Sequence, residues 1–366
     1  MSQMLQQGDR VGSFIVERLI GRGAISEVYV VRRGTESGES FAMKVLLTEV
    51  ADDDPEQIQR FVREGNLVRK MSHPNLVAVH DVGYCAEKGF YYLVMDYIAG
   101  SSLRTAIGLG GAMEPKEAIR IISCIASVLA SGERYGLVHR DIKPENIMIE
   151  DGGVVKLVDF GVVKSREVDS LSTMSNTVFG TPNYISPEQA TDASKVDFRA
   201  DVYSLGIVLF ELLTGRRPYE GRTPAEVVLF LFSPDPVPDV RTVDPTIPED
   251  IARILSRMCE KDPEKRISSA SAFIDELKSA GLWDELSLAA HPRSPSRAAS
   301  EEATFDFSFD DLPDQADDTL SFETNDAEIV DFVAKLKMRR RRKRLIRLIA
   351  IAVVALLAAC AVIALV

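Results

Sequence analysis

A short glycine-rich run, Gly21–Val28, is the first segment whose residue types could do chemistry. Small residues at a strand turn let backbone amides approach phosphate groups closely, although they also mark ordinary hairpins. Twenty-one residues after Gly23, Lys44 closes the apolar run Phe-Ala-Met. Such a lysine either snorkels to the surface or needs an anion for its desolvated ammonium. Glu64, on the next expected helix, can supply a carboxylate, so the spacing favours a site for a phosphate-bearing ligand.

A second series of motifs runs in order through the middle of the chain. His139–Asn146 is HRDIKPEN, and Asp-Phe-Gly begins at Asp159, thirteen residues after Asn146. The segments 180–188 (GTPNYISPE) and 201–206 (DVYSLG) follow. With the glycine-rich run and the lysine strand, this set resembles the protein-kinase signature. The chain is thus similar to the eukaryotic-like (Hanks-type) bacterial serine/threonine protein kinase family.

This resemblance covers about residues 12–282 and departs from the pattern at two positions. Ser26 stands where the third glycine of the loop is usual, and Ser186 stands in place of the usual alanine.

The resemblance implies roles for the residues of the catalytic motifs. Asp141 would orient the acceptor hydroxyl, and Lys143 would steady the γ-phosphate of ATP and, with Thr181, favour serine and threonine over tyrosine. Asn146 and Asp159 would be the metal ligands. Their oxygen atoms suit Mg²⁺, with Mn²⁺ as the alternative ion.

The resemblance also implies a complete ATP site. Lys44 would hold the α- and β-phosphates and pair with Glu64. The other expected nucleotide-binding residues are the loop residues Gly21, Gly23 and Ser26, the adenine sandwich of Val28, Ala42 and Met148, and the gatekeeper and hinge Met95, Asp96 and Ile98.

Five matched residues are expected to support the site without taking part in the reaction. His139 and Phe160 would pack against the catalytic loop, and Asp201 would cap the backbone of that loop. Glu188 and Arg266 would form a buried ion pair in the helical lobe.

Arg140, directly before Asp141, can pair bidentately with a phosphate on the activation loop. Between Gly161 and Gly180, the expected autophosphorylation sites are Thr173, Ser175 and Thr177. The alternative is that these hydroxyls only solvate a mobile loop.

The elements that must position these residues follow from the apolar spacing. Short alternating runs in the front third predict antiparallel strands, and a helical pattern follows from about residue 55 to 71. Beyond residue 100 the spacing is mostly helical. We therefore expect an α+β, bilobal kinase fold over residues 12–283, with a small β-rich N-lobe and a larger helical C-lobe.

Composition bounds the partners and the compartment of this 366-residue chain. The net charge of −12 argues against nucleic acid as a ligand. The N-terminus has no apolar core of the signal-peptide type. The four cysteines are widely spaced and form no Cys-x-x-Cys pair, which favours reduced thiols in a cytosolic domain.

The last part of the chain predicts a membrane anchor. Residues 284–334 form an acidic linker that is expected to be disordered, with twelve acidic residues and neither lysine nor arginine between 301 and 331. It is either a spacer or a docking segment. A basic cluster at 335–347 precedes an uncharged run at 348–366, long enough for a transmembrane helix.

The positive-inside rule keeps the basic cluster, and the kinase domain with it, in the cytoplasm, giving a C-terminally anchored single-pass protein. The cluster would also attract anionic lipid. Alanines on the last helix could support a homodimer.

These observations together predict an ATP-dependent, autophosphorylating kinase that signals by phosphorylating serine or threonine in protein substrates. A pseudokinase scaffold is the alternative, and it would be favoured by loss of Lys44, Asp141 or Asp159. A small-molecule or lipid kinase would lack the 180–188 segment. The chain has all of these features.

Overall fold

The structure is a computed structural model, and it describes residues 4–23, 26–34, 38–46, 55–159, 182–191, 196–220 and 223–283. Apart from Pro55, these residues belong to one compact unit formed by Met1–Ala51 and Glu56–His291. The expected linker, basic cluster and membrane helix, residues 284–366, lie outside the described part. Among the described helices, none combines the length and the apolar character needed to cross a membrane.

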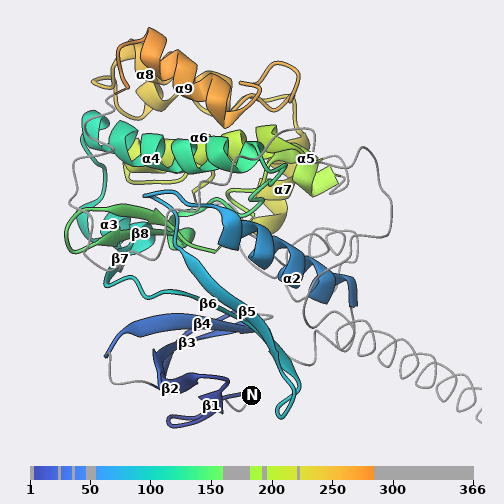
Figure 1. Cartoon of the computed structure of the whole chain (residues 1–366). Coiled ribbons are helices and arrows are strands. Elements are labelled where there is room, and N and C mark those ends of the chain that lie inside the picture. Colours follow the sequence, from blue (N-terminus) through green and yellow to red (C-terminus); the bar gives the residue numbers. More distant parts are fainter. Residues whose placement is uncertain are drawn as a thin grey trace, which may run out of the picture. The chain divides into compact units, whose positions relative to one another are not determined.

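The N-terminal part of the unit is built around an antiparallel sheet, drawn in blue shades in Figure 1. Its six strands lie in the order β1-β2-β3-β4-β6-β5. Their bounds are β1 Arg10–Val11, β2 Phe14–Arg22, β3 Ser26–Arg33, β4 Ser40–Leu46, β5 Val79–Cys85 and β6 Phe90–Asp96. The strands expected from the alternating pattern are therefore confirmed. Strands β1 to β4 pair with their neighbours in sequence, and β6 lies between β4 and β5.

The two faces of this sheet differ because side chains alternate along each strand. One face carries an apolar cluster that includes Tyr29, Val31, Met43 and Val94, all buried. Leu5, which precedes the first strand, is fully buried in the same cluster. Cross-strand partners share a face, so Lys44, whose partners are Val28 and Leu93, lies on the other one.

Helices make up most of the remaining part. A second, three-stranded sheet of β7 (Gly100–Ser102), β8 (Ile147–Glu150) and β9 (Val155–Leu157) lies between helices along the sequence. The helices are α2 Pro55–Lys70, α3 Leu103–Gly110, α4 Pro115–Glu133, α5 Pro187–Thr191, α6 Phe198–Thr214, α7 Pro224–Phe232, α8 Glu249–Met258 and α9 Ala270–Ser279, with 3-10 turns η1 at Pro144–Asn146 and η5 at Val240–Thr242. The predicted α+β division into strands and then helices is confirmed.

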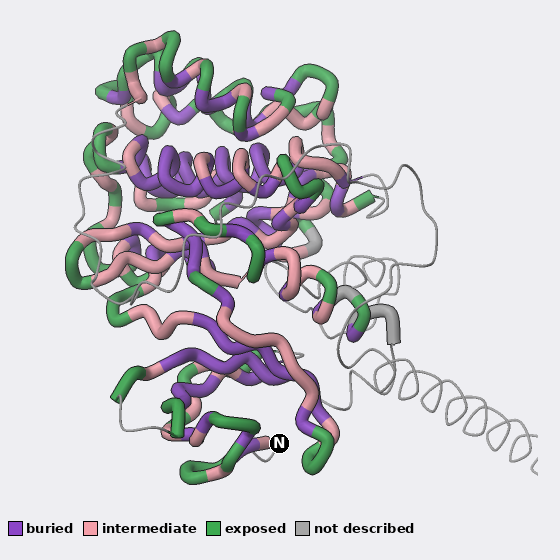
Figure 2. Tube along the Cα trace, in the orientation of Figure 1, coloured by how far each residue is buried: buried purple, intermediate pink, exposed green. Residues whose placement is uncertain are grey.

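Helix α6 is the central element of the helical part. Its residues from Ala200 to Leu213 are all buried, and the middle helices of Figure 2 are correspondingly purple. The side chain of Asp197 accepts a hydrogen bond from the Arg199 amide at the N-terminus. Gly215 ends the helix in the left-handed conformation, with φ of 71°. These two caps fix where α6 starts and stops, and they thereby place Asp201 in its first turn.

Candidate active site

Strand register brings four of the expected nucleotide-binding residues to one face of the six-stranded sheet. Val28 is the cross-strand partner of Lys44, and Ala42 is the partner of Met95. Lys44 is 8% exposed. A buried ammonium on this otherwise apolar face must meet an anion.

The carboxylate that Lys44 meets is that of Asp159, which forms an ion pair with its Nζ. The expected pair between Lys44 and Glu64 is therefore not present among the described residues. Glu64 lies on α2 and is half-buried. One carboxylate is enough to satisfy one desolvated ammonium, and Asp159 supplies it across 115 residues of sequence.

The side chain of Asp141 is held by two neighbours from its own loop. Lys143 Nζ lies 2.9 Å from Asp141 Oδ2. Asn146 Nδ2 donates to Asp141 Oδ2 and to the Asp141 carbonyl oxygen, both at 2.8 Å. The Asp141 side chain is 14% exposed. The structure thus brings together the three residues predicted for catalysis.

The backbone of this loop is fastened to α6. Asp201, buried in the first turn of α6, accepts hydrogen bonds from the amides of His139 at 2.7 Å and of Arg140 at 2.8 Å. Burial raises the pKa of Asp201 to about 7, although both amides act to lower it. His139 is fully buried, and its Nδ1 accepts from the Asp141 amide at 3.2 Å. The expected supporting roles of Asp201 and His139 are confirmed.

Two residues of the site hold an uncommon backbone conformation. Arg140 and Asp159 are the non-glycine residues with positive φ in the described part, each at 64°. Such conformations cost free energy and persist where the surroundings enforce them. At Arg140 two hydrogen bonds hold the backbone. The Arg140 amide donates to Asp201, and Gln189 Nε2 donates to the Arg140 carbonyl at 2.9 Å.

Asn146 and Asp159 offer oxygen ligands from adjacent segments. The amide of Val158 donates to the Asn146 carbonyl at 2.9 Å, which places the residue before Asp159 beside the catalytic loop. Since Nδ2 of Asn146 is engaged by Asp141, its Oδ1 is the atom available to a cation. The described residues contain no group of three or more His, Cys, Asp or Glu side chains that could hold a metal. Mg²⁺ commonly takes one or two protein ligands and completes its shell with phosphates and water, so this pair fits it.

The hinge expected at the end of β6 is anchored through Asp96. Its carboxylate lies 2.6 Å from His80 Nε2 and accepts from the Ala78 amide at 3.2 Å. Burial raises the pKa of Asp96, but these hydrogen bonds outweigh it and hold the pKa below its ordinary value. Ile98 follows in a stretch that belongs to no strand. Met148 lies on β8, in the smaller sheet.

The glycine-rich run forms the turn between β2 and β3. The Gly23 amide donates to the Ser26 carbonyl at 2.7 Å, which closes the turn. Gly21 is the cross-strand partner of Val28. These residues therefore border the face of the sheet that carries Lys44.

Arg104 is the centre of a polar network that was not expected from the sequence. Its guanidinium donates to Glu145 at 2.8 Å, to Glu211 on α6 at 2.7 Å, and to the Tyr184 hydroxyl. Tyr184 also donates to Glu211, which is 3% exposed. The network joins α3, the catalytic loop, the segment before α5, and α6. No periodicity or motif in the sequence signals it.

The expected ion pair between Glu188 and Arg266 is confirmed. Arg266 Nη1 and Nη2 lie 2.6 Å and 3.1 Å from the two carboxylate oxygens of Glu188. Its Nε donates to the Glu260 carbonyl at 2.7 Å, and the guanidinium lies over the Tyr203 ring. This bidentate pair braces the helical part, as anticipated.

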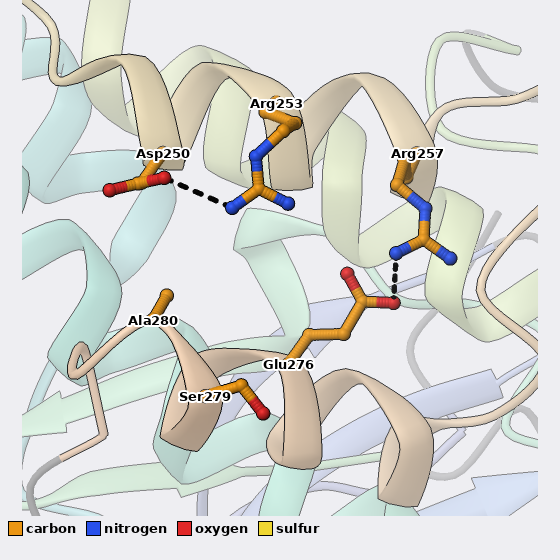
Figure 3. Close-up of a pocket in the computed structure, with 6 residues that line it drawn as sticks. All are labelled: Asp250, Arg253, Arg257, Glu276, Ser279 and Ala280. Carbon is orange, nitrogen blue, oxygen red and sulfur yellow. Dashed lines mark hydrogen bonds and ion pairs between the residues drawn. The ribbon is translucent and has the colours of Figure 1, made fainter.

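A hollow between α8 and α9 is shown in Figure 3. Its lining residues are Asp250, Arg253, Arg257, Glu276, Ser279 and Ala280. Asp250 pairs with Arg253 at 3.0 Å, and Glu276 pairs with Arg257 at 2.5 Å. None of the expected site residues lines this hollow, so it is separate from the candidate active site.

Some expected residues fall outside the described part of the chain. They are Phe160 and Thr181 together with the phosphorylation candidates Thr173, Ser175 and Thr177.

The fold and these motifs match the protein kinase domain family, whose profile covers residues 14–277. The chain therefore belongs to the protein kinase family. It is 36% identical over 280 residues to the serine/threonine-protein kinase PrkC of Bacillus subtilis, and 36% identical over 261 residues to PknB of Mycobacterium leprae. These matches cover 76% and 71% of the chain. The resemblance to Hanks-type bacterial serine/threonine kinases is confirmed.

A solved structure supports the same conclusion. The Mycobacterium tuberculosis PknI kinase domain aligns with a TM-score of 0.60 and 27% identity, over 75% of this chain and 99% of that domain. The chain spans about two fifths of its curated relatives, 42% of PrkC and 41% of PknB.

Proposed function

We propose that this chain is a serine/threonine protein kinase that transfers the γ-phosphate of ATP to hydroxyl groups of protein substrates. The observation that carries the proposal is the position of Asp141, whose carboxylate is fixed by Lys143 and Asn146. Phosphoryl transfer depends on positioning and charge neutralisation more than on covalent chemistry. A rigidly held carboxylate is the group that such a reaction needs beside the acceptor.

In the proposed reaction Asp141 accepts a hydrogen bond from the acceptor hydroxyl and aims its oxygen at the γ-phosphorus. The new oxygen–phosphorus bond forms as the bond to the ADP oxygen breaks, and Asp141 takes the hydroxyl proton. Lys143 Nζ donates a hydrogen bond to Asp141 Oδ2. Its ammonium would therefore lie beside the reacting groups, where it can neutralise charge on the phosphoryl group in transit.

Lys44 and Asp159 would exchange partners when the nucleotide binds. In the structure each neutralises the other. ATP would offer phosphate oxygens to the Lys44 ammonium, and Glu64 would then be its protein partner. Asp159 and Asn146 would hold Mg²⁺ or Mn²⁺. When bound, the metal ion would neutralise charge on the phosphates.

The adenine ring would lie against the face that carries Val28, Ala42 and Met95. Backbone groups of Asp96 and Ile98 would form hydrogen bonds with the edge of the adenine ring. Met148 would pack below the ring, and the glycine-rich turn would lie over the phosphates. The shared face of the sheet supports this assignment.

Phosphorylation of the activation loop is a further part of the proposal. Arg140 Nε is buried and has no hydrogen-bond partner among the described residues. A buried donor of this kind calls for an acceptor, and a phosphate on Thr173, Ser175 or Thr177 would supply it. Mass spectrometry after incubation with ATP tests this. An active enzyme with an unmodified loop would contradict it.

We also keep the proposal of a membrane anchor at residues 348–366, with the kinase domain on the cytoplasmic side and the basic cluster at anionic lipid. Dimerisation through the anchor is part of it. Fractionation of cells that express the full chain or a variant without 348–366 tests the anchor. Equal amounts of both proteins in the soluble fraction would contradict it.

The alternative of a pseudokinase scaffold predicts nucleotide-independent binding and no transfer. An assay with γ-labelled ATP and a mixed protein acceptor separates the two, using the full chain and Lys44→Met. We expect labelled phosphoserine and phosphothreonine from the wild type and at most traces from Lys44→Met. Equal labelling by both proteins would contradict the proposed function.

A further inference from the structure

A buried polar cluster lies on the face of the large sheet opposite Lys44. Glu27 on β3 is 2% exposed, and Tyr29, two residues further along the same strand, is fully buried. Glu27 is the cross-strand partner of Val45, so it belongs to the apolar face. Burying a carboxylate among apolar side chains is costly unless it is paired and hydrogen-bonded.

Glu27 receives partners from three directions. Arg22 Nε donates to Glu27 Oε1 at 2.8 Å, and Arg22 Nη2 lies 2.7 Å from the same oxygen. The Met4 amide donates to Glu27 Oε2 at 3.0 Å. The Tyr29 hydroxyl also donates to Oε2 and itself accepts from the Leu5 amide at 3.0 Å. The carboxylate therefore joins the glycine-rich turn to the segment before the first strand.

Arg22 places this cluster next to the glycine-rich run. Arg22 stands between Gly21 and Gly23, and it is the cross-strand partner of Glu27. The next pair along the two strands is Gly21 and Val28, on the face that carries Lys44. The Arg22–Glu27 pair is thus one residue away from the backbone expected over the phosphates.

Stability alone does not explain a charged pair here. Replacing a buried ion pair by packed apolar side chains is often neutral or stabilising, whereas removing one partner is strongly destabilising. The neighbouring positions of this face are apolar, so an apolar side chain would fit at the buried position of Glu27, whose partner Arg22 is 42% exposed. An ion pair differs from an apolar contact in its directionality, because it fixes the register and orientation of the groups that it joins.

We propose that Glu27 is a positioning residue for ATP. It fixes the glycine-rich turn through Arg22, and it anchors that turn to the N-terminal segment through the amides of Met4 and Leu5. This inference rests on the proposed kinase function. It assigns a role to a segment that lies before residue 14, where the match to the kinase family begins.

The test compares KM for ATP, kcat and Tm of the full chain with those of Glu27→Gln and Arg22→Gln. Glutamine keeps the shape of Glu27 and one acceptor for the Met4 amide, but it loses the ion pair. We expect KM for ATP to rise roughly fivefold to twentyfold in either variant, as for the loss of a charge-assisted hydrogen bond, with kcat at saturating ATP nearly unchanged. The effect of the double variant should be clearly smaller than the sum of the two single effects, because both substitutions remove the same ion pair.

The matched control is Glu17→Gln. Glu17 pairs with Arg32 across the same two strands, away from the turn, and its loss should leave KM for ATP within about twofold. Unchanged KM in Arg22→Gln overturns the proposal, as does a fall in Tm without a change in KM. Arg22 is 42% exposed, so this variant decides the matter if Glu27→Gln does not fold. A wild type that binds no ATP would instead refute the kinase function itself.

Discussion

Asn146 donates hydrogen bonds from one nitrogen atom to both the backbone carbonyl and the side-chain carboxylate of Asp141, each at 2.8 Å. This double contact closes the catalytic loop on itself and sets the direction in which the carboxylate points. The Oδ1 atom of the same amide takes no part in these two contacts, and in the proposed function it would hold the metal ion together with Asp159. One side chain would thus link the orientation of the proposed base to the proposed metal site.

Replacing Asn146 with alanine should therefore impair both functions. We expect kcat to fall at least about tenfold, because Asp141 loses its orienting donor, and we expect a higher Mg²⁺ concentration to be needed for half-maximal rate. Steady-state assays over a Mg²⁺ series measure both effects. A kcat within twofold of wild type at every Mg²⁺ concentration would show that the double contact has no catalytic importance.

Arg104→Gln should destabilise the protein by about 2–3 kcal/mol, since it leaves the buried Glu211 carboxylate without its cation. The Glu145 contact beside the catalytic loop is lost in the same change. Chemical denaturation measures the free energy of unfolding. Arg253→Gln is the control, because its pair with Asp250 is exposed at both ends, at 55% and 65%, and should matter by less than about 0.5 kcal/mol. Equal effects of the two substitutions would contradict the importance of the network.

His73 gives the protein a defined acid sensitivity. Its Nδ1 accepts from the Asn75 amide at 3.1 Å, and its Nε2 lies 3.1 Å from Ser127 Oγ. Burial lowers the pKa of His73 from 6.5 to about 4, with a smaller effect from Lys156. The unfolded chain binds this proton more readily than the folded one, so the stability from neutral His73 is complete above pH 6.5 and is lost as the pH falls toward 4.

His73→Gln should flatten this dependence. The Tm difference between wild type and variant is expected to be largest above pH 6.5 and to shrink toward pH 4. Thermal denaturation across this range measures it. A constant difference at every pH would show that His73 is not the titrating group.

Much of the fold could be predicted because local patterns specify it. The alternation of apolar and polar residues predicted the strands around Lys44. Apolar residues at helical spacing predicted α2 and α6. The supports of the catalytic loop were predictable from its motif, since His139 and Asp201 make the contacts expected of them. In these segments the contacts are either local or made by residues of the motifs themselves.

The contacts that could not be predicted depend on choices between distant partners. Glu64 was the carboxylate predicted for Lys44, but the structure pairs Lys44 with Asp159, and nothing local in the sequence decides between the two. Nothing in the sequence distinguishes Arg104 from the other arginines. Only the folded structure shows that Arg104 on α3 contacts Glu211 on α6. The N-terminal segment is mostly polar, and only the structure shows that Leu5 is buried and that its amide meets Tyr29.

In the proposed function, the carboxylate of Asp141 is required for transfer of phosphate to a hydroxyl. The most direct measurement is single-turnover transfer from γ-labelled ATP to a protein acceptor by the full chain and by Asp141→Asn, with ATP binding measured in parallel. We predict unchanged ATP affinity and a transfer rate that falls by about a thousandfold, in the range expected for loss of a catalytic base. Transfer by Asp141→Asn within tenfold of the wild-type rate would contradict the account.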